Sequence, residues 1–232
     1  TLGLYHTCPD GVSGASIQPY SWLMHSFDTL SNTGRYGPQH DDIRGIQRQY
    51  GDRYEKPGNN NHSAVAATDL GTLTLSSPLS VTTLSLDSLS DKDWFRLSAT
   101  ANLFLDVKVS PVGQIYPLAT MMMNLTCPTD AMGMPISSTI NSQTLQDLGV
   151  EVLDSNGTTI LTTANSNGAG LAETLSNIPL GAAGAKYIRV FGTGTDDVQM
   201  YDLQVTLKAS AIAPTNTPAV PTATATNTAI PA

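Results

Sequence analysis

Short runs of alternating apolar and polar residues fill residues 71–208, and this alternation constrains the fold more than any other feature of the chain. Successive side chains of a strand point to opposite faces, so alternation is typical of strands that bury one face. Such runs include TLTLSS, VTTLSLDSL, DWFRLSA, LFLDVKVS, KYIRVFG and YDLQVTLKA. Helical periodicity is nearly absent here, so we predict a mainly β fold: an antiparallel β-sandwich or jelly roll.

Two turn sequences refine this prediction. DSNG, residues 154–157, lies between GVEVL and TTILTTA, and GTGTDD, residues 192–197, precedes VQMYDLQVTL. Turn residues flanked by alternation favour tight hairpins, so we predict a hairpin at each position. Residues 120–148 interrupt the pattern as a long excursion with no periodicity that predicts its structure.

Composition divides the chain into four parts. Residues 1–55 contain most of the histidines, and residues 56–70 are a Pro, Gly and Asn linker that precedes the β region, 71–208. Residues 209–232 are rich in Ala, Thr and Pro and offer too little apolar area to offset the entropy of ordering. We expect this tail to be a disordered stalk suited to attachment at a cell surface, or else an incidental low-complexity end.

Charge and cysteine content narrow the function classes. The chain carries a net charge of -8, with 11 Lys and Arg that never cluster, which excludes the basic footprint of a nucleic-acid binder. No apolar run approaches the roughly 20 residues that span a bilayer. Cys8 and Cys127 permit one disulfide, two bridges to other chains or two thiols, and slightly favour an exported protein.

One helix is predicted before the β region, in PQHDDIRGIQRQYG, residues 38–51. Asp41 and Asp42 lie in its first turn, where carboxylates stabilise the helix dipole, and Gly51 follows its end. Three apolar residues at i, i+3 and i+7 predict one buried face: Ile43, Ile46 and Tyr50.

The first residues, TLGLYH, have the spacing of the second half of the zinc-protease motif H-E-x-x-H-x-x-G-x-x-H, whose first five residues are missing. The segments LGLYH, WLMHS and HDDIRGIQRQYG together resemble the C-terminal part of a matrixin-type metzincin over about the first 51 residues. The resemblance implies a zinc endopeptidase with His6 as third metal ligand and Met24 as the Met-turn methionine. Ser26 departs from the family's usual proline, and an ordinary histidine and core methionine are the alternatives.

In that family the general base is a glutamate between the first two histidines, and this chain lacks it. We therefore expect the chain to be the C-terminal fragment of a longer protein, inactive alone, with the catalytic glutamate upstream of Thr1.

The β region has a second resemblance. LSLDSLSDKDWFRLSA, with LGVEVLDSNGTTIL and KYIRVFGTGTDDVQMYDLQVTL, is similar to bacterial pre-peptidase C-terminal domains, β-sandwiches appended to secreted proteases. Its D-x-D-x-F element is Asp91, Asp93 and Phe95. The two aspartates are candidate Ca²⁺ ligands, or else a solvated turn. Trp94 and Phe95 should point to opposite faces, one of them into the core.

These features predict a fragment of a secreted or cell-surface zinc metalloendopeptidase, with Zn²⁺ as cofactor, Ca²⁺ as a candidate second ion, and a protein or peptide substrate. The alternative is a non-enzymatic extracellular adhesion or binding module that carries a degenerate protease remnant.

Overall fold

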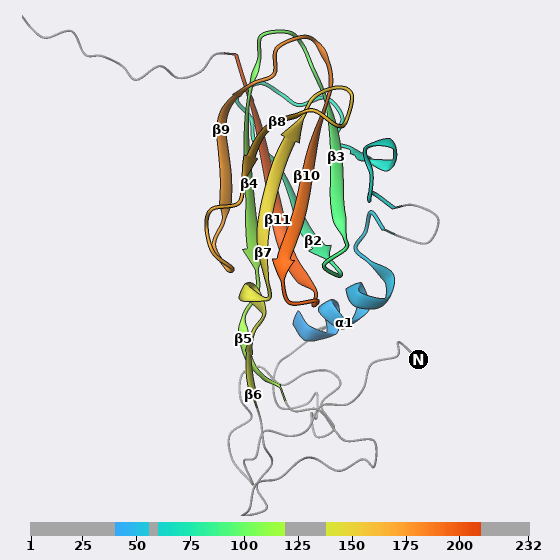
Figure 1. The fold of residues 1–232 in the computed structure, drawn as a ribbon, viewed down its shortest axis with the longest axis vertical. Helices are drawn as coiled ribbons and strands as arrows, with labels where there is room; N and C mark the ends of the chain where they lie inside the picture. The colour runs from blue at the N-terminus through green and yellow to red at the C-terminus, as the bar shows by residue number, and fades with distance from the viewer. Residues whose placement is uncertain (1–39, 56–59, 119–137, 210–232) are drawn as a thin grey trace, which may run out of the picture.

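The computed structural model describes residues 40–55, 60–118 and 138–209 (Figure 1). His6, Met24, Cys8 and Cys127 therefore lie outside the described residues, as do residues 210–232. The described elements are α1 (His40–Tyr50), η1 (Ala64–Ala66), β1 (Thr68–Asp69), β2 (Leu79–Leu86), β3 (Lys92–Ala99), β4 (Phe104–Val112), β5 (Ile115–Leu118), β6 (Ser138–Asn141), η2 (Ser142–Thr144), β7 (Gln146–Leu153), β8 (Ile160–Ala164), β9 (Glu173–Pro179), β10 (Gly184–Gly194) and β11 (Gln199–Lys208).

Two sheets pack face to face, which confirms the predicted β-sandwich (Figure 1). One sheet has the order β1-β3-β10-β7-β8 and the other β2-β11-β4-β9, while β5 and β6 form a separate two-stranded sheet. All pairs are antiparallel except β1 with β3. The inward side chains of both sheets form one core that includes Leu84, Phe95, Leu105, Ile188 and Leu203, all fully buried.

The two predicted hairpins have different outcomes. β7 and β8 pair as expected across the DSNG turn, where the Asp154 N–H donates to the Thr159 carbonyl at 2.8 Å. The hairpin predicted at GTGTDD is wrong, because β10 and β11 belong to opposite sheets. β11 pairs with β2 and β4 instead, so this loop carries the chain across the core.

Residues 60–70, assigned to a linker from the sequence, lie on the sandwich. η1 follows the loop at 60–63, and β1 pairs in parallel with β3 through Thr68 and Phe95. The last part of the predicted excursion likewise forms β6, η2 and the start of β7.

The helix is confirmed, but its predicted buried face is wrong. Arg44 and Gln47 are buried, whereas Ile43 and Ile46 are half-buried and Tyr50 is exposed. The reason is that α1 packs on the β10–β11 loop, whose carbonyl and carboxylate oxygens are matched by a guanidinium rather than an alkyl side chain. None of the described helices is long and apolar enough to cross a membrane.

Both edge strands of the four-stranded sheet are irregular. Thr83 in β2 has φ +63° and its N–H donates to Asp202 Oδ1 on β11 at 3.3 Å. Asn177 in β9 has φ +56° and its N–H donates to Asp106 Oδ1 on β4 at 2.7 Å. In each case the strand register shifts beside the irregular residue, as at a β-bulge.

Candidate functional site

The most unusual group of side chains lies where the segment after α1 meets the sandwich. We call it the acidic junction and define it by five residues: Asp52, Glu55, His62, Asp91 and Asp93. The first two follow α1, His62 lies in the loop before η1, and the aspartates stand immediately before and within β3. Two separate parts of the sequence therefore contribute to one site, with Asp91 29 positions after His62.

Gly51 makes this arrangement possible because it ends α1 in the left-handed region, with φ +66°. Its N–H donates to the Gln47 carbonyl at 2.8 Å. A Cβ at position 51 would lie 2.4 Å from Glu55 Cβ, so the glycine also leaves room for the glutamate to fold back. The chain consequently turns straight from α1 into the junction.

Asp52 holds this turn on the sandwich. Its Oδ1 accepts the Tyr54 N–H at 2.7 Å and its Oδ2 accepts the Ser85 N–H of β2 at 3.3 Å. Its own N–H donates to Glu55 Oε2 at 3.1 Å. Backbone amides thus position both carboxyl groups, and of their four oxygens only Glu55 Oε1 has no hydrogen bond.

Three side chains of the junction bring donor atoms of metal-binding type together. One donor atom from each of Glu55, His62 and Asp91 lies within 4.8 Å of the others. His62 Nδ1 is 2.9 Å from Asp91 Oδ1 and 3.4 Å from Glu55 Oε1. The side chains of Glu55 and Asp91 are 3% and 1% exposed, while that of His62 is 46% exposed. The imidazole therefore forms the solvent side of a buried acidic pair.

Asp93 lies two residues along β3 and is fully buried. Its Oδ2 accepts a hydrogen bond from the Tyr201 hydroxyl on β11, while its Oδ1 has no hydrogen-bond partner. Glu55 Oε1 and both side-chain atoms of the buried Asn61 also lack one. Buried polar atoms are normally paired, so this part of the molecule has unused binding capacity.

Burial and mutual repulsion raise the pKa of every carboxyl group in the junction. For Glu55 the pKa rises to about 8, chiefly because of burial and then because of the Asp91 charge. Burial, followed by the charge of Asp91, raises the pKa of Asp93 well above its usual range. Burial likewise raises the pKa of Asp52 and of Asp91. The junction therefore favours bound protons or a bound cation over bare negative charge.

The structure brings the sequence-predicted pair Asp91 and Asp93 to one site, but not as a solvated turn, since both are buried. Whether they bind an ion stays a prediction. Phe95 enters the core as expected, whereas Trp94 is covered on the opposite face, with the Arg189 guanidinium 5.1 Å from its ring centroid.

Sequence reasoning missed Asp52 and Glu55 and placed His62 in a linker. The usable signal was D-x-x-E directly after the helix-ending Gly51, because a turn there returns both acids to the body of the protein. The predicted zinc ligand His6 and the methionine Met24 lie outside the described residues.

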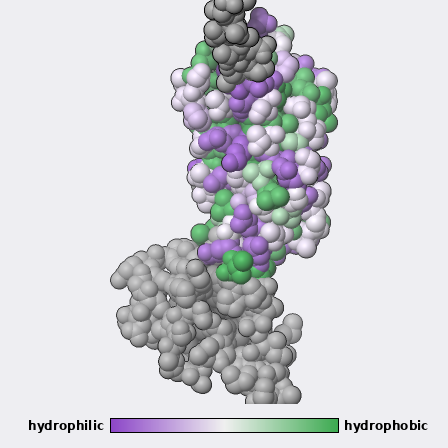
Figure 2. Space-filling view, turned by 90° about the vertical axis from the view of Figure 1, so that its left-hand side faces the viewer, coloured by the Kyte–Doolittle hydropathy of each residue, from purple (hydrophilic) through white to green (hydrophobic). Residues whose placement is uncertain are grey.

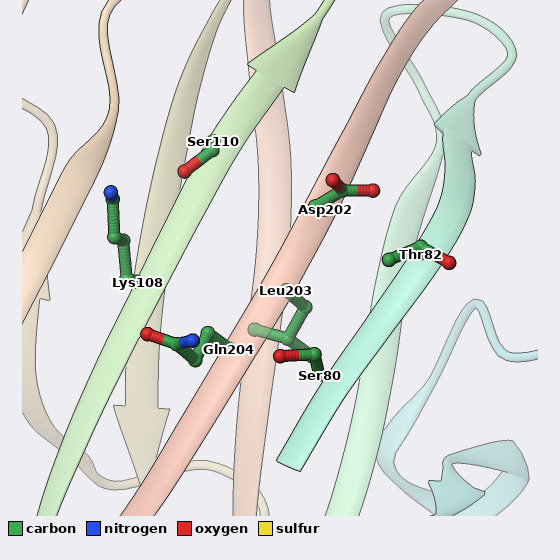
Figure 3. Close-up of a pocket in the computed structure, with 7 residues that line it drawn as sticks. All are labelled: Ser80, Thr82, Lys108, Ser110, Asp202, Leu203 and Gln204. Atoms are coloured by element: carbon green, nitrogen blue, oxygen red, sulfur yellow. The ribbon is translucent and has the colours of Figure 1, made fainter. Parts of the chain in front are cut away.

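A second feature is a shallow depression on the outer face of the four-stranded sheet (Figure 3). Its lining is mostly polar: Ser80, Thr82, Lys108, Ser110, Asp202, Leu203 and Gln204. Asp202 already accepts the Thr83 N–H, and the lining contains neither histidine nor cysteine. On the face shown in Figure 2, hydrophilic and hydrophobic residues are interspersed without one broad apolar area. The acidic junction is thus the better candidate site.

No protein-family model matches the sequence, and no curated protein matches it. Among solved structures, the chain is similar to the pre-peptidase C-terminal domain of a collagenase from Bacillus anthracis, with 11% identity and TM-score 0.31, over 61% of this chain and 94% of that one. It is also similar to PliG of Aeromonas hydrophila, a periplasmic inhibitor of g-type lysozyme, with 12% identity and TM-score 0.31, over 62% of this chain and 100% of that one.

Proposed function

We propose that the chain is the C-terminal part of a secreted zinc metalloendopeptidase whose β-sandwich is a non-catalytic accessory domain. The observation that carries the proposal is α1. The segment HDDIRGIQRQYG, which resembles the closing helix of a matrixin catalytic domain, is helical over His40–Tyr50 and ends at a left-handed Gly51. A degenerate remnant would not need to keep the helix, its termination and its docking together.

The docking of α1 supports the accessory role of the sandwich. Arg44 Nε donates to the Val198 carbonyl at 3.1 Å and its Nη2 to Asp197 Oδ1 at 2.7 Å. Arg48 Nη2 donates to Asp196 Oδ2 at 3.1 Å. The β10–β11 loop thus holds the helix at one end of the sandwich, a connection suited to two domains that act together.

The proposed chemistry belongs to the longer protein. When bound, zinc polarises a water molecule and the substrate carbonyl. By its resemblance to the family, His6 supplies one ligand to that metal and Met24 lies near it, while the general-base glutamate comes from upstream of Thr1. The 232 residues alone should not cleave peptides. The Thr- and Pro-rich composition of residues 209–232 supports a secreted or cell-surface location. The proposed substrates, which follow from the resemblance to the protease family, are proteins or peptides.

The test begins with the gene sequence upstream of Thr1. The proposal expects H-E-x-x-H there and cleavage of casein or gelatin by the complete protein, abolished by a zinc chelator. His6→Ala should abolish cleavage, whereas the matched variant His25→Ala should retain it.

The contrary result is an upstream region without that motif, or cleavage that the chelator leaves unchanged. Either outcome would replace the enzyme with the non-enzymatic adhesion or binding module.

A further inference from the structure

We infer that the acidic junction binds a divalent transition-metal ion of the zinc or manganese class, with Glu55, His62 and Asp91 as its protein ligands. This site is separate from the zinc position expected at His6 and does not depend on the proposed protease activity. Its ion joins the segment after α1 to the start of β3.

The spacing of the donor atoms fits such an ion. Ligand atoms at about 2.1 Å from a metal stand roughly 3.4 Å apart in a tetrahedral site and roughly 3.0 Å apart in an octahedral one. His62 Nδ1 lies 3.4 Å from Glu55 Oε1 and 2.9 Å from Asp91 Oδ1. Without an ion, the shorter of these separations is a hydrogen bond between the imidazole and the Asp91 carboxyl group. Both separations match those between ligand atoms of a small divalent ion, and the third pair, Glu55 and Asp91, lies within 4.8 Å.

Glu55 Oε1 gives independent support. This oxygen is buried, has no hydrogen-bond partner and faces the imidazole of His62. The other oxygen of the same carboxylate accepts the Asp52 N–H, which orients the free one toward the junction. Leaving a buried carboxylate oxygen without a hydrogen bond is costly, and the 3.4 Å ion pair with the half-exposed His62 offsets only part of that cost, so a bound cation stabilises the site further.

The imidazole decides the class of ion. Ca²⁺ and Mg²⁺ take oxygen ligands, whereas imidazole nitrogen favours zinc and its transition-metal neighbours. His62 is also the exposed member of the set, so it offers the route by which an ion enters. Asp93 lies behind the ligands and is held by Tyr201, which assigns it a positioning role rather than a direct one.

The ligands come from two parts of the sequence: Glu55 and His62 follow α1, and Asp91 comes 29 positions after His62. Asp91 is fixed by the Asp87 N–H, which donates to its Oδ2 at 2.9 Å, and by the turn in which the Asp91 N–H donates to the Ser88 carbonyl at 3.2 Å. The Trp94 N–H donates to the Asn61 carbonyl at 2.8 Å, which places the loop that carries His62 beside β3. An ion at this point fastens the loop and the turn to the sheet.

The test uses the whole 232-residue chain without a metal-binding tag, in a His6→Ala background so that the position expected for the catalytic zinc contributes nothing. After dialysis against a chelator, the protein is titrated calorimetrically with Zn²⁺, Mn²⁺ and Ca²⁺. We expect one zinc ion per chain and Ca²⁺ binding at least about tenfold weaker, since nitrogen ligands discriminate against it.

His62→Ala should weaken zinc binding by about 100-fold or more, because even outer-shell partners of metal ligands are worth 10- to 100-fold. His62→Asp makes the site all oxygen and should reverse the preference in favour of Ca²⁺. His25→Ala serves as the matched control and should change nothing. Glu55→Gln supplies a second ligand variant, and circular dichroism shows whether each variant is folded.

Three results would overturn the assignment: neither zinc nor manganese bound by the parent chain, Ca²⁺ bound more tightly than both, or an affinity for the bound transition metal unchanged in both His62→Ala and Glu55→Gln. None of these results concerns peptide cleavage, so failure of the metal site and failure of the protease proposal are separate outcomes.

Discussion

Two contacts, one at α1 and one at residues 52–55 and 60–62, hold the N-terminal described segments on the sandwich, and their charges are balanced in opposite ways. In the helix dock, Arg44 and Arg48 meet Asp197 and Asp196. In the acidic junction, four carboxyl groups face one another with a histidine at the solvent side. In the helix dock, the arginines of the chain neutralise the aspartate charges. In the acidic junction, protons or an ion from solution must neutralise the carboxylate charges. One contact is permanent and the other depends on conditions.

The same residue type shows the contrast directly. Asp196 accepts the Leu89 N–H and the Arg48 guanidinium, and these two hydrogen bonds hold its pKa below the usual range. Burial raises the pKa of Asp91 instead, although His62 and the Asp87 N–H oppose the shift. In the junction, the cost of desolvation outweighs the favourable contacts. Asp196 is exposed, so its desolvation cost is small.

The largest expected effect breaks the helix dock. Arg44→Ala removes a buried guanidinium and leaves the Val198 carbonyl and Asp197 without their partner, which should lower the free energy of unfolding by about 3 kcal/mol. Gln49→Ala, at an exposed position of the same helix, is the matched control and should change it by less than about 0.5 kcal/mol. Urea unfolding of the two variants measures both values. Equal effects would show that Arg44 does not hold α1 on the sandwich.

A pH series separates the two contacts. In chelator, Glu55 has a pKa of about 8 in the folded protein against 4.5 ordinarily, so the folded state binds more protons between these values. The contribution of Glu55 to stability is therefore greatest below the lower value and falls as pH rises toward 8, by on the order of 2 kcal/mol between about pH 6 and about pH 7.5.

Glu55→Gln has no proton to lose at this position and should flatten the decline. An equally steep decline in this variant would assign the pH dependence to another group. Asp196 acts in the opposite sense, because its lowered pKa gives stability that is lost only as pH falls below its ordinary range.

Tyr201→Phe tests the buried end of the junction. The change removes one hydroxyl and leaves Asp93 Oδ2 without its hydrogen bond in the core, which should cost about 1.5 kcal/mol. Tyr187→Phe, on the outer face of the other sheet, is the control. Thermal unfolding at pH 6 in chelator compares them, and an effect no larger than that of the control would mean that Tyr201 does not hold Asp93.

The smallest expected effect on stability comes from the exposed ion pair of the helix dock, Arg48 with Asp196. Arg48 and Asp196 have side chains 41% and 58% exposed, so Arg48→Ala should cost about 0.5 kcal/mol and less at high salt. The measurement is urea unfolding with and without added sodium chloride. A cost as large as that of Arg44→Ala would show that burial does not separate the two arginines.

The fold could be predicted from the sequence where the signal is local. Alternation identifies the strands because each strand's own residues record which of its faces is buried. The turn at residues 192–197 was misread because turn residues show that the chain reverses, but not whether the next strand joins the same sheet. That choice is made by β2 and β4, which pair with β11 from far away in the sequence.

Only the part of the candidate site that lies in one local motif could be predicted from the sequence. Asp91 and Asp93 are adjacent to a recognisable strand, so a motif finds them. Glu55 and His62 become ligand candidates only because a helix end and a loop are folded against that strand. Arg44 likewise violates the apolar pattern of its helix, and its acidic partner is 153 positions away.

The bulges at Thr83 and Asn177 have a consequence for self-association. An ordered fibre grows when a strand of one molecule continues the ladder of another, and an interrupted edge gives it no regular template. Both margins of the four-stranded sheet are interrupted in this way, and β1 at one margin of the other sheet is two residues long. Of the edge strands of the two large sheets, β8 offers the template, since it is longer than β1 and has no left-handed residue, and its Ile160 and Leu161 are exposed.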